Sequence, residues 1–473
     1  MKAITQTRLK AVLASVCSGL AFAASVTAAD LYVPADYPTI QAAVDAAQSD
    51  DTIHIAAGVY AGQVLISNKS LTLSGAPGAV LRATTGMMAP YSGAEFGASL
   101  VPVLGILRSD VVVSNLAFEG EHLANAYTDR QYMVAIFYFG SGGRVEDCRI
   151  TGFREPDLGS GFARAVQVSN PAFLSTGAVT IQILRNTFAD NNISITLIGD
   201  SKSYTHSTFD PSLLRTTFVV SDNIITGNGP HATGVQSGVH ILAGATGEVS
   251  RNKISDYAYV GTTDPSPWAF GILALDDMDY GQAPLQPLKP IRFEGNVLRN
   301  NQWHMALVRG DGSTIVDNTF DGTAPGLRPT GLALSGENPS VDRNRFSNLP
   351  KGMVLLGNDP EFGTYLGIAH NAQLNTNRYC NVTTNVLVEP LATLAAGAEK
   401  GELACLPAQP ILDNTRAVFL SWPDSYAGYF LETAPSVDGP WTQSSATLFL
   451  QDGRNSVAVP MNSTQQYFRL HHP

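Results

Sequence analysis

The sequence predicts an all-β solenoid in which short strands wind into coils that stack in parallel. An Asn followed two positions later by a bulky apolar residue recurs along the chain, at Asn186, Asn223, Asn252, Asn296, Asn318, Asn344 and Asn377. The intervals between these Asn residues run from 22 to 44 residues, and periods of this size are typical of solenoids. Each unit is also rich in Val, Ile, Phe and Thr with alternating polarity, which favours strands over helices.

The repeated Asn is expected to be structural rather than catalytic. At a tight bend between strands, Asn tolerates a left-handed backbone, and its side chain can bond the equivalent Asn one coil away. Parallel coils repeat at roughly 4.8 Å, which allows such bonds. The bulky residue two positions later is expected to point inward and fill the core.

The first 29 residues are expected to be a secretory signal peptide. Lys2, Arg8 and Lys10 form a positive start, an apolar run follows over residues 11–26, and small residues close the segment. A membrane anchor is the alternative, but the run is short and ends without charge. No later segment is long and apolar enough to span a bilayer. The sequence therefore predicts export, either extracellular or periplasmic in a host with an outer membrane.

Charge and cysteine content narrow the class of protein further. The chain has 29 basic and 40 acidic residues, and loss of the three leader cations leaves a net charge of about −14, which argues against nucleic acid as a partner. Cys380 and Cys405 are the expected disulfide pair of an exported protein, because both lie near the end of the repeats. Cys148 lies in an apolar strand context and is expected to be a buried, inert thiol.

The chain resembles the right-handed parallel β-helix proteins of the pectin lyase-like superfamily over residues 30–405. The repeats carry this resemblance, together with the segment "YPTIQAAVDAAQSDDTIHIAAGVY" that begins at Tyr37. Within that segment, Ile40, Val44 and Ala47 share one helical face, and Thr39 is a good N-cap. The resemblance implies that this helix covers the open first coil, and that an extended polysaccharide binds to one face of the solenoid.

Residues 406–473 are expected to form a separate small β-sandwich. Alternating strands separated by Gly, Asp, Pro and Ser replace the coil pattern there. The segment is similar to fibronectin type III-like modules. Trp422 and Trp441 could stack on sugars, but a packing role is the preferred interpretation.

The strand that follows each Asn strand can be aligned by its alternation. Inward positions are predicted at Val166, Ile193, Val239, Ile272, Met305, Leu332 and Met353. Outward positions are predicted at Gln167, Ser194, His240, Leu273, Ala306 and Ala333, with His304 also facing outward. Long insertions flank this sheet at residues 153–163, 227–237 and 256–269 on one side and at 169–177, 199–217 and 276–290 on the other. The sheet is therefore predicted to be the floor of a groove with two walls.

Polar and aromatic residues of this groove are the candidate site. Catalysis is placed at His240, Asp276, Asp277, His304 and Arg309, and substrate binding at Gln167, Trp268, Tyr280 and Trp303. An Asp pair can act as acid and base in glycoside hydrolysis, a His can abstract a proton in a lyase reaction, and an Arg can bind a carboxylate. The competing interpretation is that the Asp run is a solvated turn and that the histidines are surface residues.

The sequence thus predicts a polysaccharide-active protein, either a glycoside hydrolase or a polysaccharide lyase. The alternative is a non-catalytic glycan-binding or adhesion protein, because segments matching the catalytic motifs of pectin methylesterases, polygalacturonases and pectate lyases are absent. No cofactor is required by the sequence; Ca²⁺ is compatible with the aspartates, but no set of metal ligands is defined. A monomer is expected.

Overall fold

The computed structural model describes two compact units, divided between residues 404 and 405. The described residues are 28–90, 99–127, 131–155, 163–170, 177–199, 216–229, 236–242, 244–258, 269–275, 290–322, 330–358, 366–399, 417–423, 429–444, 448–451, 454–460 and 467–472. Residues 1–27 of the predicted leader lie outside them. Among the described residues, no helix has the length and hydropathy needed to cross a bilayer.

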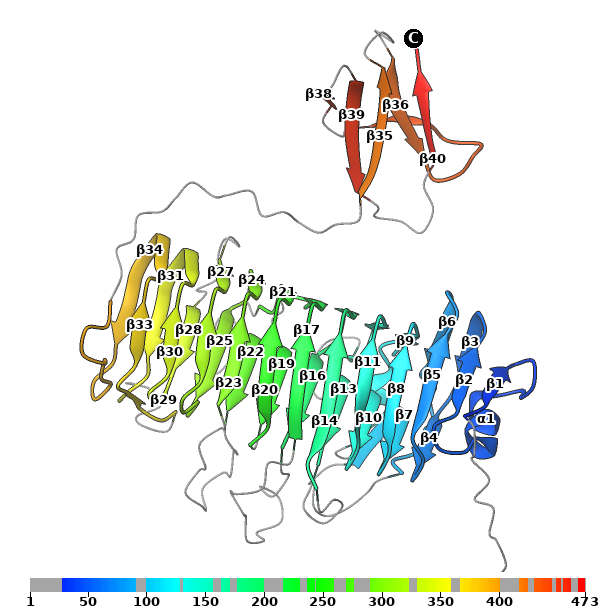
Figure 1. The fold of residues 1–473 in the computed structure, drawn as a ribbon, viewed down its shortest axis with the longest axis horizontal. Coiled ribbons are helices and arrows are strands. Elements are labelled where there is room, and N and C mark those ends of the chain that lie inside the picture. Colours follow the sequence, from blue (N-terminus) through cyan, green and yellow to red (C-terminus); the bar gives the residue numbers. More distant parts are fainter. Residues whose placement is uncertain are drawn as a thin grey trace, which may run out of the picture. The chain divides into compact units, whose positions relative to one another are not determined.

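The larger unit is a parallel β-helix, as predicted (Figure 1). One 12-stranded sheet contains β1 (Asp30–Val33), β2 (Thr52–Ile55), β5 (Leu71–Gly75), β8 (Asp110–Ser114), β11 (Gly142–Glu146), β14 (Val179–Leu184), β17 (Thr216–Ser221), β20 (Thr246–Ser250), β23 (Ile291–Glu294), β26 (Thr314–Val316), β30 (Ser340–Asp342) and β33 (Gln373–Asn375). Each of these strands pairs in parallel with its neighbour one coil away.

A second, 20-stranded sheet contains two sets of strands from each coil. The short set is β3 (Gly58–Ala61), β6 (Ala79–Arg82), β9 (Ala117–Glu119), β12 (Arg149–Thr151), β15 (Thr187–Ala189), β18 (Ile224–Thr226), β21 (Lys253–Ser255), β24 (Val297–Arg299) and β27 (Thr319–Asp321). The other set, called the long sheet below, is β4 (Val64–Ser67), β7 (Ser99–Leu107), β10 (Gln131–Phe139), β13 (Arg164–Ser169), β16 (Ile193–Ile198), β19 (Gln236–Leu242), β22 (Ala269–Leu275), β25 (Trp303–Val308) and β28 (Thr330–Leu334). Strands β31 (Arg345–Leu355) and β34 (Arg378–Val388) run through both sets and join them.

Four smaller elements complete the described part of the unit. Helix α1 (Ile40–Ala46) lies beside the first strands (Figure 1), and the Thr39 hydroxyl accepts a hydrogen bond from the Ala42 amide at 3.1 Å. Its predicted role as a cap over the first coil stays a prediction. A 3-10 turn, η2, spans Leu123–Ala126, and β29 (Gly336–Glu337) pairs with β32 (Ala369–His370).

The Asn ladder is present and continuous. In Asn252, for example, the backbone amide and the side-chain amide both donate to Asn296 Oδ1, each at 3.0 Å, and the side-chain amide also donates to the Val220 carbonyl at 2.9 Å. The same bonds link every successive pair of the predicted ladder residues, Asn186, Asn223, Asn252, Asn296, Asn318, Asn344 and Asn377. All seven are buried. The ladder therefore satisfies polar groups inside each bend and ties each coil to the next.

The left-handed residue of each bend is not the ladder Asn, contrary to the prediction. It is the residue immediately before, as in Arg185 (φ 55°), Asp222 (φ 60°) and Arg251 (φ 55°). The ladder Asn is needed for its side-chain amide, whereas the preceding position tolerates charged residues because their side chains reach solvent. These alternate in sign, and Arg251 Nη2 lies 2.9 Å from Asp222 Oδ2.

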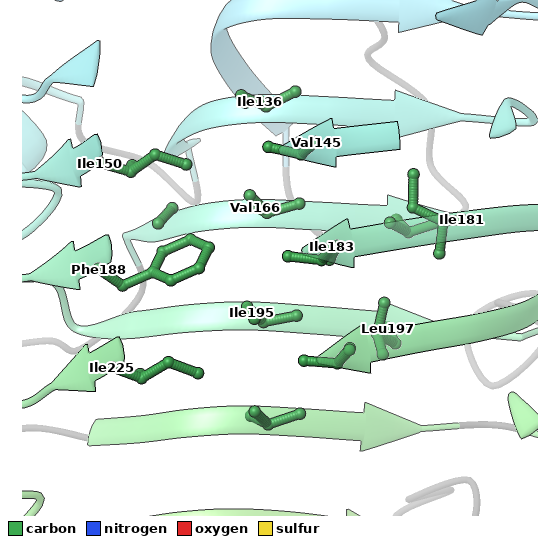
Figure 2. Packing of buried hydrophobic residues seen from close by; sticks show 14 of the residues in the cluster. Ile136, Val145, Ile150, Val166, Ile181, Ile183, Phe188, Ile195, Leu197 and Ile225 are labelled. Atoms are coloured by element: carbon green, nitrogen blue, oxygen red, sulfur yellow. The ribbon is translucent and has the colours of Figure 1, made fainter. Parts of the chain in front are cut away.

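Apolar side chains fill the interior in rows that follow the coil axis. Ile136, Val166 and Ile195 occupy one register position in consecutive coils, and Figure 2 shows them in line. The residue two positions after each ladder Asn is buried as predicted: Phe188, Ile225, Ile254, Leu298, Phe320, Phe346 and Tyr379. The last three form a ring stack with centroid separations of 4.7 and 5.1 Å.

Two cysteines can be placed. Cys148 is a buried free thiol, as expected, and burial raises its pKa to about 12. Cys380 is disulfide-bonded. Its predicted partner, Cys405, lies outside the described residues, so the pairing itself stays a prediction.

The smaller unit has two antiparallel three-stranded sheets. One contains β35 (Ala417–Pro423), β39 (Arg454–Pro460) and β38 (Leu448–Gln451), and the other contains β37 (Thr442–Gln443), β36 (Phe430–Ala434) and β40 (Tyr467–His471). Trp422 is buried with Leu431 and Val457 from both sheets, so the sheets share a core, as in the fibronectin type III-like module that was expected. Trp441 packs beneath Arg469, whose guanidinium carbon lies 4.4 Å from its ring.

Candidate functional site

The outward face of the long sheet has three rows of residues in strict register. The middle row runs Phe137, Gln167, Thr196, His240, Leu273, Ala306, Ala333 and Val354. The predicted outward positions Gln167, His240, Leu273, Ala306 and Ala333 are therefore correct. In β16 the outward residue is Thr196, not Ser194. Correspondingly, Ile195 rather than Ile193 takes the inward position next to Val166.

His304 faces the core, so the prediction that it faces outward is wrong. Its ring is fully buried, with Nδ1 3.2 Å from the Thr330 carbonyl and Nε2 3.0 Å from the Asp321 carbonyl. The ring also meets the edge of Phe320. Burial lowers the pKa of His304, and the two carbonyls oppose that shift only in part. His304 is therefore a neutral structural residue, not a partner base.

The error at His304 has a single cause in the backbone. Near the start of each strand of the long sheet, two successive residues face the core, so the alternation changes phase. In β13, both Ala165 and Val166 belong to the core. In β16, Ser194 turns inward and its hydroxyl bonds the Tyr257 hydroxyl at 2.8 Å. His304 occupies the equivalent position in β25, ahead of the inward Met305.

Polar residues gather on the outward face of three consecutive strands of the long sheet, β13, β16 and β19. We call this set the polar window; it consists of Arg164, Gln167, Ser169, Thr196, Ser237 and His240. The same register positions before β13 and immediately after β19 carry apolar residues. Within the window, the Gln167 amide donates to the Ser169 hydroxyl at 3.2 Å, and Arg164 is the only cation among its described members. The guanidinium of Arg164 lies over the Tyr132 ring, 5.2 Å from its centroid.

Several polar atoms of the window are buried without a hydrogen-bond partner among the described residues. They are Gln167 Oε1, Thr196 Oγ1, and both ring nitrogens of His240. At the starts of β16 and β19, the side-chain amides of Asn192 and Gln236 are likewise buried and unsatisfied. Native proteins leave few such groups, and those that remain call for a ligand, a water or a functional reason. Their concentration in adjacent coils makes this part of the face the candidate binding site.

His240 is held in the neutral form. The residue is half-buried, yet Nδ1 and Nε2 are both shielded from water. Burial, reinforced by the positive charge of Arg164, lowers the pKa of His240 to about 3. A neutral imidazole offers one donor and one acceptor, so it can hydrogen-bond a hydroxyl or receive a proton.

This protonation behaviour predicts a pH-dependent loss of stability. The unfolded chain titrates this histidine near pH 6.5, whereas the folded chain resists protonation down to about pH 3. The neutral His240 therefore makes its full contribution to the free energy of unfolding above about pH 6.5, and this contribution is lost as the pH falls below that value. Between pH 7 and 5 the free energy of unfolding should drop by about 2 kcal/mol more in the wild type than in His240→Gln. Denaturant titrations at the two pH values measure this difference; parallel pH profiles for the two proteins would contradict it.

The remaining predicted site residues do not all reach the window. Asp276, Asp277, Tyr280 and Trp268 lie outside the described residues, as do most of the predicted wall segments. Arg309 follows β25 in a left-handed conformation (φ 57°), and its amide donates to Ser335 Oγ at 2.8 Å. It lies two coils and three residues from His240, about 14 Å between Cα atoms.

Trp303 faces outward and is half-buried. Its ring centroid lies 6.0 Å from that of Phe270, and both rings pack against the apolar cluster that follows the window. Within the described residues, no group of three or more His, Cys, Asp or Glu side chains is arranged to hold a metal ion.

The sequence analysis did not identify Arg164 and Thr196, which belong to the polar window. Each is a polar residue in an otherwise apolar strand, which is the signal that could have found them. Only the register of the coils shows that Thr196 lies next to His240.

Comparisons with known proteins bear on the fold. No family model and no curated protein matches the sequence. Among solved structures, a PL6 family alginate lyase, AlyGC, aligns with a TM-score of 0.48 and 16% identity, covering 78% of this chain and 46% of that one. The match thus spans about half the length of that protein.

Two further structures are similar. The Dettilon tailspike protein aligns with a TM-score of 0.43 and 13% identity, covering 91% of this chain and 76% of that one. The catalytic domain of a GH87 α-1,3-glucanase aligns with a TM-score of 0.42 and 12% identity, covering 78% and 68%. These proteins are right-handed parallel β-helices. At this level of identity the likeness assigns no role to any residue.

Proposed function

We propose that this chain acts on a uronate-containing polysaccharide in the polar window, as a lyase. The observation that carries the proposal is a neutral His240 with both ring nitrogens buried and unsatisfied, on the same face as Arg164, whose charge adds to the burial that lowers the pKa of His240. A guanidinium recognises a carboxylate through a planar fork of donors. Gln167 and Thr196 supply the neutral hydrogen-bonding atoms that sugar hydroxyls need.

The chemistry assigned to each group is a β-elimination. Arg164 neutralises the uronate carboxylate, which makes the proton on C5 more acidic. His240 accepts that proton, the C–H electron pair forms a double bond between C4 and C5, and the C4–O bond to the neighbouring sugar breaks. The departing oxygen takes up the proton that His240 accepted, which returns the imidazole to its neutral form. The negative charge of the bound carboxylate raises the pKa of His240 from its low value in the free protein, which favours proton acceptance.

Glycoside hydrolysis is a weaker proposal for the described residues. It needs two carboxylates flanking the bond, and the window has none among its described members. The predicted pair, Asp276 and Asp277, could supply them from outside the described residues. A non-catalytic glycan-binding role is favoured by one observation, the low pKa of His240, because a weakly basic imidazole serves better as a hydrogen-bond partner than as a base.

The test is a panel of uronate polysaccharides and neutral glucans given to the full chain. A lyase produces the ultraviolet absorbance of an unsaturated uronate, and only with uronate polymers. Reducing ends without that absorbance would assign a hydrolase, and binding by affinity electrophoresis without either signal would assign the binding role. Absence of both cleavage and binding across the uronate panel would overturn the proposal.

A further inference from the structure

The sheet of the smaller unit that contains β37, β36 and β40 has one face in the core and one face outside it. Leu431 belongs to the core, so its neighbours Phe430 and Glu432 lie on the outer face. The strand register places Arg469 opposite Glu432. The side chains of Arg469 and Glu432 are 45% and 13% exposed. This face therefore presents the cation to solvent and keeps the carboxylate beneath it.

Two contacts hold the guanidinium of Arg469 in place and leave its terminal nitrogens uncommitted. Its Nε donates to Glu432 Oε2 at 2.7 Å, and its guanidinium carbon lies 4.4 Å from the centroid of the Trp441 ring. A guanidinium stacked on an aromatic ring keeps its planar fork of donors in a defined orientation. Among the described residues, neither terminal nitrogen of Arg469 has a hydrogen-bond partner.

This arrangement distinguishes Arg469 from the arginines of the ladder bends. Arg185, Arg251 and Arg343 each donate through both Nε and Nη2 to an aspartate of the neighbouring coil, so a carboxylate of the chain already fills one side of each fork. Arg469 makes a single bond to Glu432 and stacks on a ring instead. Two parallel N–H donors match the two oxygens of a carboxylate, and the terminal nitrogens of Arg469 supply such a pair.

Two aromatic rings lie beside Arg469 on the same face. Phe430 pairs with His471 across β36 and β40, and their ring centroids are 5.3 Å apart. The His471 side chain is 43% exposed. Aromatic rings left at a surface bind apolar surfaces, and a fork of donors binds a carboxylate. The sugar unit of a uronate polysaccharide offers both, namely an apolar ring face and a carboxylate.

We infer that this outer face is a second binding site for the uronate polysaccharide, with the carboxylate on the terminal nitrogens of Arg469 and the sugar ring against Phe430 and His471. This rests on the proposed function for the identity of the polymer. The site lies in the smaller unit, whereas the polar window lies in the larger one, and it holds the polymer without cleaving it. A second attachment within one chain is intramolecular, so it raises the apparent affinity for a long polymer.

Affinity electrophoresis of the full chain in gels that contain a long uronate polymer tests this site. Arg469→Ala should weaken the apparent affinity by about tenfold or more, because it impairs one of two linked attachments. Arg469→Lys keeps the charge but not the fork, and should weaken binding in the same direction. Arg292→Ala is the matched control: Arg292 donates through Nε to Glu294 at 2.8 Å and is 47% exposed, but no described aromatic ring lies over it. Equal retention of Arg469→Ala and the control would overturn the inference.

Turnover separates this inference from the proposed function. A short uronate oligosaccharide engages one site at a time, so Arg469→Ala should cleave it at the wild-type rate. A folded Arg469→Ala protein that lost this turnover would overturn the inference by placing Arg469 in the reaction. If the wild type were retained without cleaving and Arg469→Ala lost retention, the second site would stand and the lyase would fall. A wild type that cleaves the polymer but binds it no better than the oligosaccharide would refute the second site alone.

Discussion

Asn296→Ala should lower the free energy of unfolding by about 3–5 kcal/mol, because its side chain bonds three other residues inside the bend. Asn296 is fully buried, and its Oδ1 accepts two bonds from Asn252, one from the backbone amide and one from the side chain. Its side-chain amide donates to the Val249 carbonyl and to Asn318 Oδ1. Truncation removes the side-chain partner of the buried Asn252 backbone amide and of the Val249 carbonyl, and a buried group that loses its partner is desolvated without compensation.

Equilibrium denaturation of the full chain measures this loss. Asn358→Ala is a matched control, because Asn358 is exposed and stands outside the ladder, and its effect should stay within about 0.5 kcal/mol. If Asn296→Ala cost no more than that control, the ladder would not be what joins the coils.

His240→Gln should lower kcat/KM on a uronate polymer by about 10²–10⁴-fold, the range that a positioned general base contributes. Glutamine keeps a donor and an acceptor on a side chain of similar reach, so substrate binding should change less than turnover. What it removes is the group that accepts the proton. The loss should therefore appear in kcat rather than in KM.

His370→Gln makes the same chemical change outside the window, on β32, and should retain full activity. Thermal unfolding at pH 7 checks that both variants are folded. A His240→Gln protein with wild-type kcat would exclude His240 as the base, and the role would then pass to residues outside the described part of the window.

The sequence predicted the coil architecture well because the physical signals repeat. Each ladder Asn and each bulky residue two positions later marks the same bend, so errors in one unit are corrected by the next. The alternation also placed Gln167 and His240 on one outward row, because strand side chains alternate between faces.

The predictions that were wrong concern the orientation or backbone conformation of single residues, and each error has a physical cause. Simple alternation cannot reveal the point where two successive residues face the core, and this reversed the orientation predicted for His304 and Ser194. The left-handed residue was assigned to the ladder Asn because Asn tolerates that conformation, but the ladder needs its amide inside the bend, so residues such as Asp222 take the positive φ instead.

The candidate site was harder to predict than the fold. His240 was identified because a histidine is conspicuous in an apolar strand, whereas Arg164 and Thr196 matter only through their register with it. Residues that act together in stacked coils are far apart in sequence. Which residues become neighbours depends on the lengths of the insertions between the coils, and no local sequence pattern predicts those lengths.

The most direct test of the account is a crystal structure of the full chain with a short uronate oligosaccharide. The account predicts a carboxylate at Arg164 and sugar oxygens within hydrogen-bond distance of Gln167, Thr196 and His240. Sugar bound only elsewhere, with these atoms still unpartnered, would contradict it.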